Sequence, residues 1–186
     1  MTLRYAILLA MALVMVTSAR AQDAVPEPND YRTDNYRAPV PATLKGAQVV
    51  TTKEAEAIWR DKRGAFVDVM PRPPKPANLP PETVWRDKPR RNIPGSLWLP
   101  DTGYGRLAAA TETYLQDGLA RASAGNPTAL LVIYCQANCW MSWNAAKRAL
   151  SYGYSNVVWY SEGTDGWEWE DLPLVDAEPE PRPPAK

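Results

Sequence analysis

The chain has 186 residues, which suits one domain with tails, and its 21 Lys and Arg residues equal its 21 Asp and Glu residues. Because no excess of positive charge is present, we expect no nucleic-acid partner. The sequence contains no histidine, so the commonest general base and the commonest metal ligand are both missing. We therefore expect neither a metal nor a cofactor.

Residues 1–21 have the pattern of a secretory signal peptide. Arg4 gives a positive start, residues 6–16 form an apolar run too short to span a membrane, and Ala19-Arg20-Ala21 fits a small-residue cleavage site. The mature chain would then begin near Gln22. We expect a periplasmic protein with no membrane attachment after cleavage; the alternative is a retained membrane anchor.

The mature chain begins with an extended segment and a short αβ unit. Residues 22–46 are rich in Pro, Asn and Asp and predict an extended lead-in, which Tyr31 and Tyr36 could dock. A short strand is expected over residues 47–50. The capping box Thr51-Thr-Lys-Glu54 then opens a helix.

The second strand, expected over residues 65–70, carries Asp68 near its carboxyl end. Asp68 either accepts hydrogen bonds from loop amides or acts in catalysis. A Pro-rich insert follows over residues 71–92, and its basic residues are Arg72, Lys75, Arg86, Lys88, Arg90 and Arg91. The insert is either a solvated excursion, or it folds over the Cys135 loop to supply a cation or to dock an acidic partner.

The remaining strands and helices alternate along the chain. We expect a short third strand behind a turn over 93–100 and strands over 129–134 and 156–160. Helices are expected over 107–123, 141–150 and, briefly, after Glu162. This order predicts an α/β domain over residues 47–175, with a single open, mostly parallel five-stranded sheet flanked by helices. The Pro- and Glu-rich residues 176–186 predict a disordered tail.

Both cysteines lie in the loop that leads from the fourth strand into the next helix. Cys135 ends a buried apolar run, and Cys139 follows four residues later. Open α/β sheets bind ligands at this edge, and loop amides with a helix dipole favour an anion such as a thiolate. The other residues expected to form this anion cradle are Gln136, Ala137, Asn138, Trp140 and Met141.

Several roles remain open for the two cysteines. They could form a redox couple in which Cys135 attacks and Cys139 resolves, a static disulfide, or two unrelated thiols. Two thiolates could also hold Cu(I), or zinc with Asp101 or Asp165, but no second ligand pair has metal spacing. A covalent c-type haem is excluded because Cys-x-x-Cys-His is absent.

Several segments together resemble a rhodanese (sulfurtransferase) domain over residues 47–174. They are Phe66-Val-Asp68-Val, Ile93-Pro-Gly95-Ser, Val132-Ile-Tyr-Cys135, Gly153-Tyr-Ser-Asn-Val-Val and Glu162-Gly163-x-x-Gly166-Trp167. The resemblance implies that Cys135 carries sulfur as a persulfide. It also implies an arginine at the fifth position after the cysteine, where this chain has Trp140. Losing that cation would weaken the capture of thiosulfate-like donors.

A narrower resemblance covers residues 135–148 and 163–167. These segments are similar to the exported PQQ-dependent catabolism-associated CXXCW motif proteins, although three residues separate the cysteines here rather than two. The resemblance implies a periplasmic protein that works beside a PQQ-dependent alcohol dehydrogenase or its cytochrome c. Asp68, Trp143 and Asp165 are candidates for a supporting shell around the cysteines.

Two functional hypotheses follow. The first is thiol chemistry at Cys135 and Cys139, as sulfur transfer or thiol–disulfide exchange. The second is a non-catalytic accessory module that binds the dehydrogenase or the cytochrome through the basic insert and a tryptophan-rich surface. Trp140 and Trp143 fit the core or a pocket wall better than a quinone-stacking site.

Overall fold

The computed structural model describes residues 25–73, 75–86 and 88–182, so the signal peptide predicted for residues 1–21 lies outside the described part. Across these ranges, no helix has both the length and the apolar character needed to cross a membrane. The elements are β1 (Gln48–Val50), α1 (Thr52–Arg60), β2 (Ala65–Asp68), β3 (Arg90–Asn92), β4 (Leu97–Trp98), α2 (Ala109–Ala122), β5 (Leu131–Tyr134), α3 (Trp140–Ser151), β6 (Val157–Tyr160), α4 (Gly163–Trp169) and β7 (Val175–Ala177).

A five-stranded parallel sheet in the order β1-β6-β5-β2-β4 forms the centre of the domain. The two central strands, β5 and β6, are buried at every residue, as their unbroken apolar and aromatic sequences predict for strands covered on both faces. The predicted α/β class and single five-stranded sheet are confirmed.

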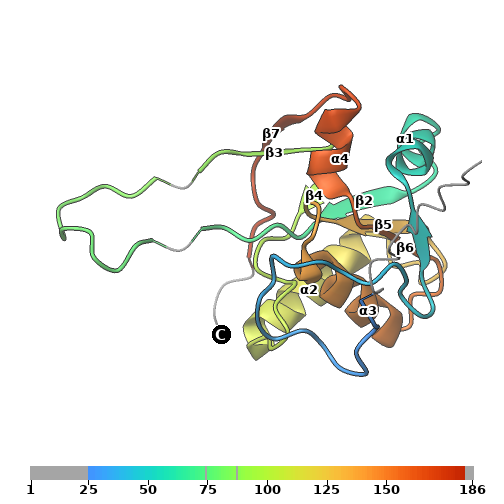
Figure 1. Ribbon diagram of the computed structural model, residues 1–186, viewed down its shortest axis with the longest axis horizontal. Helices are drawn as coiled ribbons and strands as arrows, with labels where there is room; N and C mark the ends of the chain where they lie inside the picture. The colour runs from blue at the N-terminus through green and yellow to red at the C-terminus, as the bar shows by residue number, and fades with distance from the viewer. Residues whose placement is uncertain (1–24, 74, 87, 183–186) are drawn as a thin grey trace, which may run out of the picture.

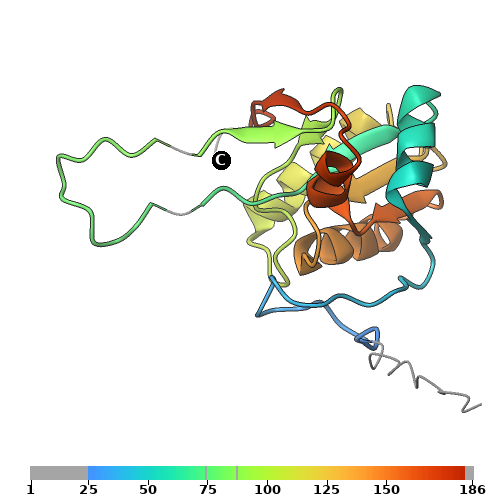
Figure 2. The ribbon, with the colours of Figure 1, turned by 45° about the horizontal axis from the view of Figure 1, so that its top comes forward.

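Helices cover both faces of this sheet (Figure 1). Alternate residues of β5 point to opposite sides, so Val132 and Tyr134 pack with α1 and α4, whereas Leu131 and Ile133 pack with α2 and α3. Figure 2 shows the same two layers from a second direction. The carboxyl ends of the strands therefore meet at one edge, where the loop after β5 leaves the sheet.

Helix α3 is buried on its outer side as well, because the lead-in crosses it (the blue segment of Figure 1). The indole N–H groups of Trp140 and Trp143 donate to the carbonyl oxygens of Pro39 and Thr43 at 3.1 and 3.2 Å. Asn144 is fully buried and exchanges two hydrogen bonds with the backbone of Arg32. The two tryptophans thus belong to the packing between α3 and the lead-in.

In the segment 93–100, predicted as a short third strand behind a turn, the turn comes first and the strand follows it. Pro94 and Gly95 form a turn in which the Ser96 amide donates to Ile93, and Gly95 has a φ of 84°. Only Leu97–Trp98 joins the sheet, as β4. The insert is correspondingly not irregular throughout, because its last residues, 90–92, form β3.

The expectation of a disordered tail from residue 176 is corrected for residues 176–182. β7 pairs antiparallel with β3, and Pro179 bridges to Trp98. The hydroxyl of the buried Tyr114 donates to the carbonyl oxygen of Glu180 at 2.7 Å. The Pro- and Glu-rich composition suggested disorder, but backbone pairing to a distant strand does not depend on apolar side chains.

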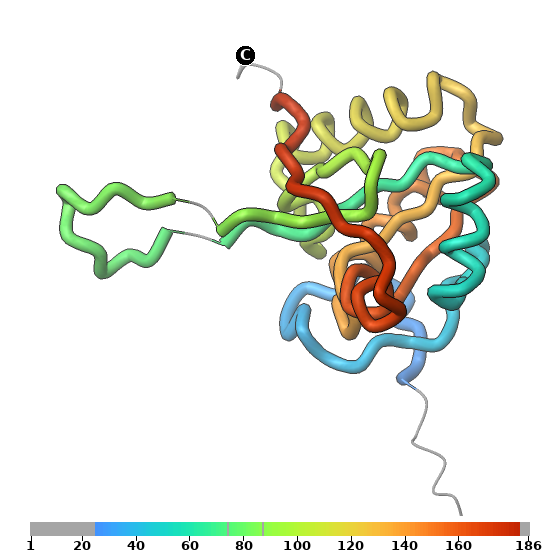
Figure 3. The backbone as a smooth tube through the Cα atoms, turned by 90° about the horizontal axis from the view of Figure 1, so that it is seen from above, coloured from blue at the N-terminus to red at the C-terminus, as the bar shows by residue number. Residues whose placement is uncertain are grey.

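The part of the insert before β3 projects away from the body of the domain, as Figures 1 and 3 both show. We call residues 71–73, 75–86 and 88–89 the projecting arm. Within the arm, the amides of Leu79 and Thr83 donate to the carbonyl oxygens of Pro76 and Pro80, and each bond closes a single turn. Val84 is 80% exposed in this arm.

A truncation that ends the chain at Leu174 tests the ordered tail. It removes β7, the acceptor of the Tyr114 hydroxyl and the guanidinium of Arg182 that stacks on the Tyr114 ring. We expect the free energy of unfolding in urea to fall by about 1–3 kcal/mol. A chain that ends at Arg182 keeps these contacts and serves as the control. Equal stability of the two truncated chains would contradict the ordered tail.

Candidate functional site

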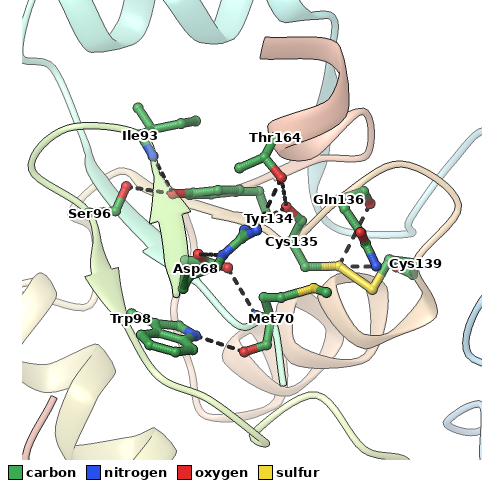
Figure 4. A network of polar contacts seen from close by, with 11 residues as sticks. Asp68, Met70, Ile93, Ser96, Trp98, Tyr134, Cys135, Gln136, Cys139 and Thr164 are labelled. Carbon is green, nitrogen blue, oxygen red and sulfur yellow. Dashed lines mark hydrogen bonds and ion pairs between the residues drawn. A yellow bond between two sulfur atoms is a disulfide. The ribbon is translucent and has the colours of Figure 1, made fainter. Parts of the chain in front are cut away.

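The two cysteines form a disulfide in the loop between β5 and α3 (Figure 4). Cys135 directly follows β5, and Cys139 is the N-cap residue of α3, with 6.6 Å between their Cα atoms. The disulfide is compatible with a redox couple and with a static bridge, and it excludes the alternative of two unrelated thiols. Among the described residues, no group of three or more acidic or cysteine side chains could hold a metal ion.

The lead-in covers the disulfide. Cys135 is 0% exposed and Cys139 is 2% exposed. The carbonyl oxygen of Tyr36 accepts the Trp140 amide at 2.9 Å, and Arg37 forms an antiparallel bridge with Cys139. The Arg37 guanidinium also donates to the carbonyl oxygen of Ala137 at 2.7 Å. We call residues 36–37 the closing segment, because they bind the loop from outside.

The structure departs from the open amide cradle predicted for this loop. The Cys135 sulfur lies 3.7 and 3.9 Å from the carbonyl oxygens of Gln136 and Cys139, so the negative ends of two dipoles face it. The Trp140 amide is already bonded to the closing segment. Asn138 is exposed with a φ of 51°, and Met141 is buried at the start of α3.

The main chain of Cys135 is held from three directions. Its carbonyl oxygen accepts from the Thr164 amide and the Thr164 hydroxyl, both at 3.1 Å, and from the Arg90 guanidinium at 3.2 Å. Gly163 approaches so closely that an added Cβ would lie 2.7 Å from the Cys135 carbonyl, and its φ is 54°. Glycine is therefore required where α4 starts. These bonds fix the end of β5 against α4.

A buried ion pair stands beside this anchor. Arg90 donates from Nε to Asp68 at 2.7 Å, and Asp68 also accepts the Met70 amide at 2.9 Å. Burial raises the pKa of the Asp68 carboxyl, and the Arg90 charge opposes that rise. The insert does not fold over the Cys135 loop, because the part before β3 projects away from the domain, but Arg90 of β3 brings a cation to the Cys135 carbonyl oxygen. The sequence offered several basic residues there and no signal that selects Arg90.

The other two residues predicted to support the cysteines, Trp143 and Asp165, do not form one group with Asp68. Trp143 is fully buried between α3 and the lead-in, and its ring meets that of Trp140 edge to face at 5.5 Å. Asp165 is exposed on the first turn of α4. It lines a pocket of about 420 Å³ together with Ala137 and the 87% exposed Trp169. Asp68 is thus the member of this set that the structure ties to Cys135, through Arg90.

Comparison with known protein families identifies the family of the chain. The model of the rhodanese-like domain family matches residues 51–170, so the chain belongs to that family. No curated protein matches.

Solved structures with a similar fold include a polysulfide-sulfur transferase homodimer from Wolinella succinogenes, at 17% identity and a TM-score of 0.44, covering 72% of this chain and 81% of that one. The human single-domain sulfurtransferase TSTD1 is 20% identical at a TM-score of 0.42, covering 67% and 97%. An uncharacterized protein from Saccharomyces cerevisiae is 20% identical at 0.39, covering 67% and 92%.

The close approach of Gly163 to Cys135 gives a stability test. Gly163→Ala adds both a strained backbone and a clash with the main chain of the loop, and we expect it to cost about 3 kcal/mol or more. Gly153→Ala is the matched control, because Gly153 has a φ of 94° but open space around it. It should cost about 1 kcal/mol from strain alone. Equal losses in urea unfolding would argue against the close packing at Cys135.

Proposed function

We propose that this protein is an exported thiol–disulfide protein in which Cys135 and Cys139 cycle between a disulfide and a dithiol. The observation that carries the proposal is the disulfide itself, placed at the carboxyl end of the central strand and at the N-terminus of α3. That edge of an open α/β sheet is where ligands bind, and the dipole of α3 favours a thiolate at Cys139.

The exchange needs an external dithiol as the reductant. One external thiolate attacks the sulfur of Cys139, the S–S bond breaks, and Cys135 leaves as a thiolate. The second external thiol then displaces Cys139 from the mixed disulfide. Two electrons and two protons pass from the external dithiol to the protein. In the reverse direction, the Cys139 thiolate attacks a substrate disulfide, and Cys135 resolves the mixed disulfide and closes the bond between the two cysteines.

Exchange fits the site better than sulfur transfer from thiosulfate. A persulfide on Cys135 requires a free thiol, and in this state the sulfur is bonded to Cys139. Trp140, at the fifth position after Cys135, supplies an indole that donates to Pro39 rather than a cation that could hold an anionic donor. Sulfur transfer would therefore have to start from the reduced protein.

Equilibration of the purified mature protein in glutathione redox buffers tests the proposal. We expect both cysteines to shift together between disulfide and dithiol, read by alkylation and mass spectrometry at each ratio. Cys135→Ser and Cys139→Ser should each abolish the two-electron transition. A disulfide that stays oxidised at every ratio would support a static bridge instead. Sustained thiocyanate formation from thiosulfate and cyanide would favour sulfur transfer.

Because the disulfide is buried, we expect exchange to require the closing segment to move away from the loop. Arg37→Ala removes the hydrogen bond to Ala137 that holds the closing segment, and the loop should open about 1 kcal/mol more easily. Reduction of the disulfide by dithiothreitol should then be roughly fivefold faster. The control is Arg86→Ala, an exposed arginine of the projecting arm. An unchanged rate would show that the closing segment does not limit access.

A second candidate function is a non-catalytic accessory module in the periplasm. The projecting arm favours it, since a long, locally basic segment with an exposed Val84 leaves the domain and is anchored at its base by β3. An acidic protein surface would complement such an arm. By family resemblance, we propose a PQQ-dependent alcohol dehydrogenase or its cytochrome c as the partner.

The partner proposal is tested with purified dehydrogenase and cytochrome from alcohol-grown cells that produce this protein. Binding should be weakened when residues 75–86 are replaced by a Gly-Ser segment of equal length, and should weaken with rising salt. The matched comparison is Cys135→Ser, which leaves the arm intact. Cell fractionation of the full chain tests export. A cytoplasmic location would remove the support for both candidate functions.

A further inference from the structure

The ion pair of Asp68 and Arg90 has no part in the exchange chemistry as written, although it adjoins the site. The Asp68 side chain is 0% exposed and that of Arg90 is 14% exposed. Burying two opposite charges is a weak source of stability, because the loss of hydration offsets their attraction. The position of this pair therefore points to a role at the neighbouring cysteine.

One guanidinium joins three elements around Cys135. Its Nε donates to Asp68 at the end of β2, its Nη1 donates to the Thr164 hydroxyl of α4 at 3.3 Å, and its Nη2 donates to the carbonyl oxygen of Cys135 at 3.2 Å. β3 holds the backbone of Arg90 by pairing it with Ala177 of β7. The cation thus has a fixed place beside the residue whose sulfur leaves during reduction.

The charges around that sulfur oppose one another. Two carbonyl oxygens face it at 3.7 and 3.9 Å and disfavour a thiolate. The positive charge of Arg90 acts in the opposite sense, and the carboxylate of Asp68 cancels part of it. Removing Arg90 and removing the Asp68 charge should therefore have opposite effects on Cys135.

We propose that Arg90 is a positioning residue that holds Cys135 in place and stabilises its thiolate, and that Asp68 limits this stabilisation by holding and partly neutralising the guanidinium. The inference rests on the thiol–disulfide exchange proposed above. The buried ion pair of Asp68 and Arg90 thereby sets how readily Cys135 leaves as a thiolate when the disulfide is reduced.

Other charged groups near the loop stay constant in the test. Arg37 binds the Ala137 carbonyl from the lead-in. Lys53, Glu162 and Asp165 line the pocket that also includes Ala137. None of these is altered in the variants compared below, so their effect on the sulfur is common to all of them.

The experiment titrates the Cys135 thiol by thiolate absorbance in a Cys139→Ser background, where it is the single thiol. Arg90→Gln should raise the thiol pKa by about one unit, and Asp68→Asn should lower it by about one unit. Arg90→Lys keeps the charge and should stay within about half a unit of the parent. The control is Asp101→Asn, which removes a carboxylate that pairs with Arg182 and leaves Cys135 untouched.

Opposite signs of the two shifts in the Cys135 thiol pKa distinguish this role from a purely structural one. Shifts of the same sign in Arg90→Gln and Asp68→Asn, or no shift in folded Asp68→Asn, would overturn the inference. If Arg90→Gln does not fold, Arg90→Lys and Asp68→Asn still decide the matter. The exchange proposal fails separately: the thiol could titrate with these shifts while the wild-type disulfide stays oxidised in every glutathione buffer.

Discussion

The carbonyl oxygen of Cys135 is the point on which the arrangement of this site depends. It accepts hydrogen bonds from Thr164 of α4 and from Arg90 of β3, and so joins the central strand to two elements that lie far from it along the chain. Because Arg90 is itself held by Asp68 on the neighbouring strand, the loop with the two cysteines starts from a fixed point. The loop then leads from this point into α3.

The remainder of the loop is closed from the other side by the lead-in. In a sheet covered by helices, the outer face of α3 would ordinarily be in water, yet here Trp140, Trp143 and Asn144 are buried beneath residues 32–43. This burial explains why α3 has apolar or small residues around most of its circumference. It also means that the segment covering the disulfide lies before residues 51–170, the range that the rhodanese-like family matches.

The projecting arm and the tail form a second connected unit. The arm returns to the domain at β3, and β3 is paired with β7, so the cation at the disulfide loop is supported by a C-terminal segment. A change in the arm or in the tail could therefore reach the cysteines through Arg90, without any direct contact with the sulfurs. The domain thus has two supports for one loop, the closing segment outside and the Arg90 anchor inside.

Much of this fold could be predicted because its signals are local. The apolar run that ends at Cys135, the capping box at Thr51 and Glu54, and the alternation of strands and helices each depend on neighbouring residues, and they led to the α/β class, the five-stranded sheet and the position of the cysteine loop. Composition was less reliable. It suggested a disordered tail where backbone pairing orders residues 176–182.

The sequence by itself therefore determined the class of fold, the family resemblance and the placement of two cysteines at the ligand-binding edge of the sheet. Only the tertiary structure decided that the sulfurs are bonded and covered, that Arg90 among the basic residues of the insert reaches Cys135, and that Asp68 is its partner. The physical reason is distance along the chain. Arg37 and Ala137 are 100 residues apart and Arg90 and Cys135 are 45 apart, so these contacts exist only once the sheet has brought the segments together.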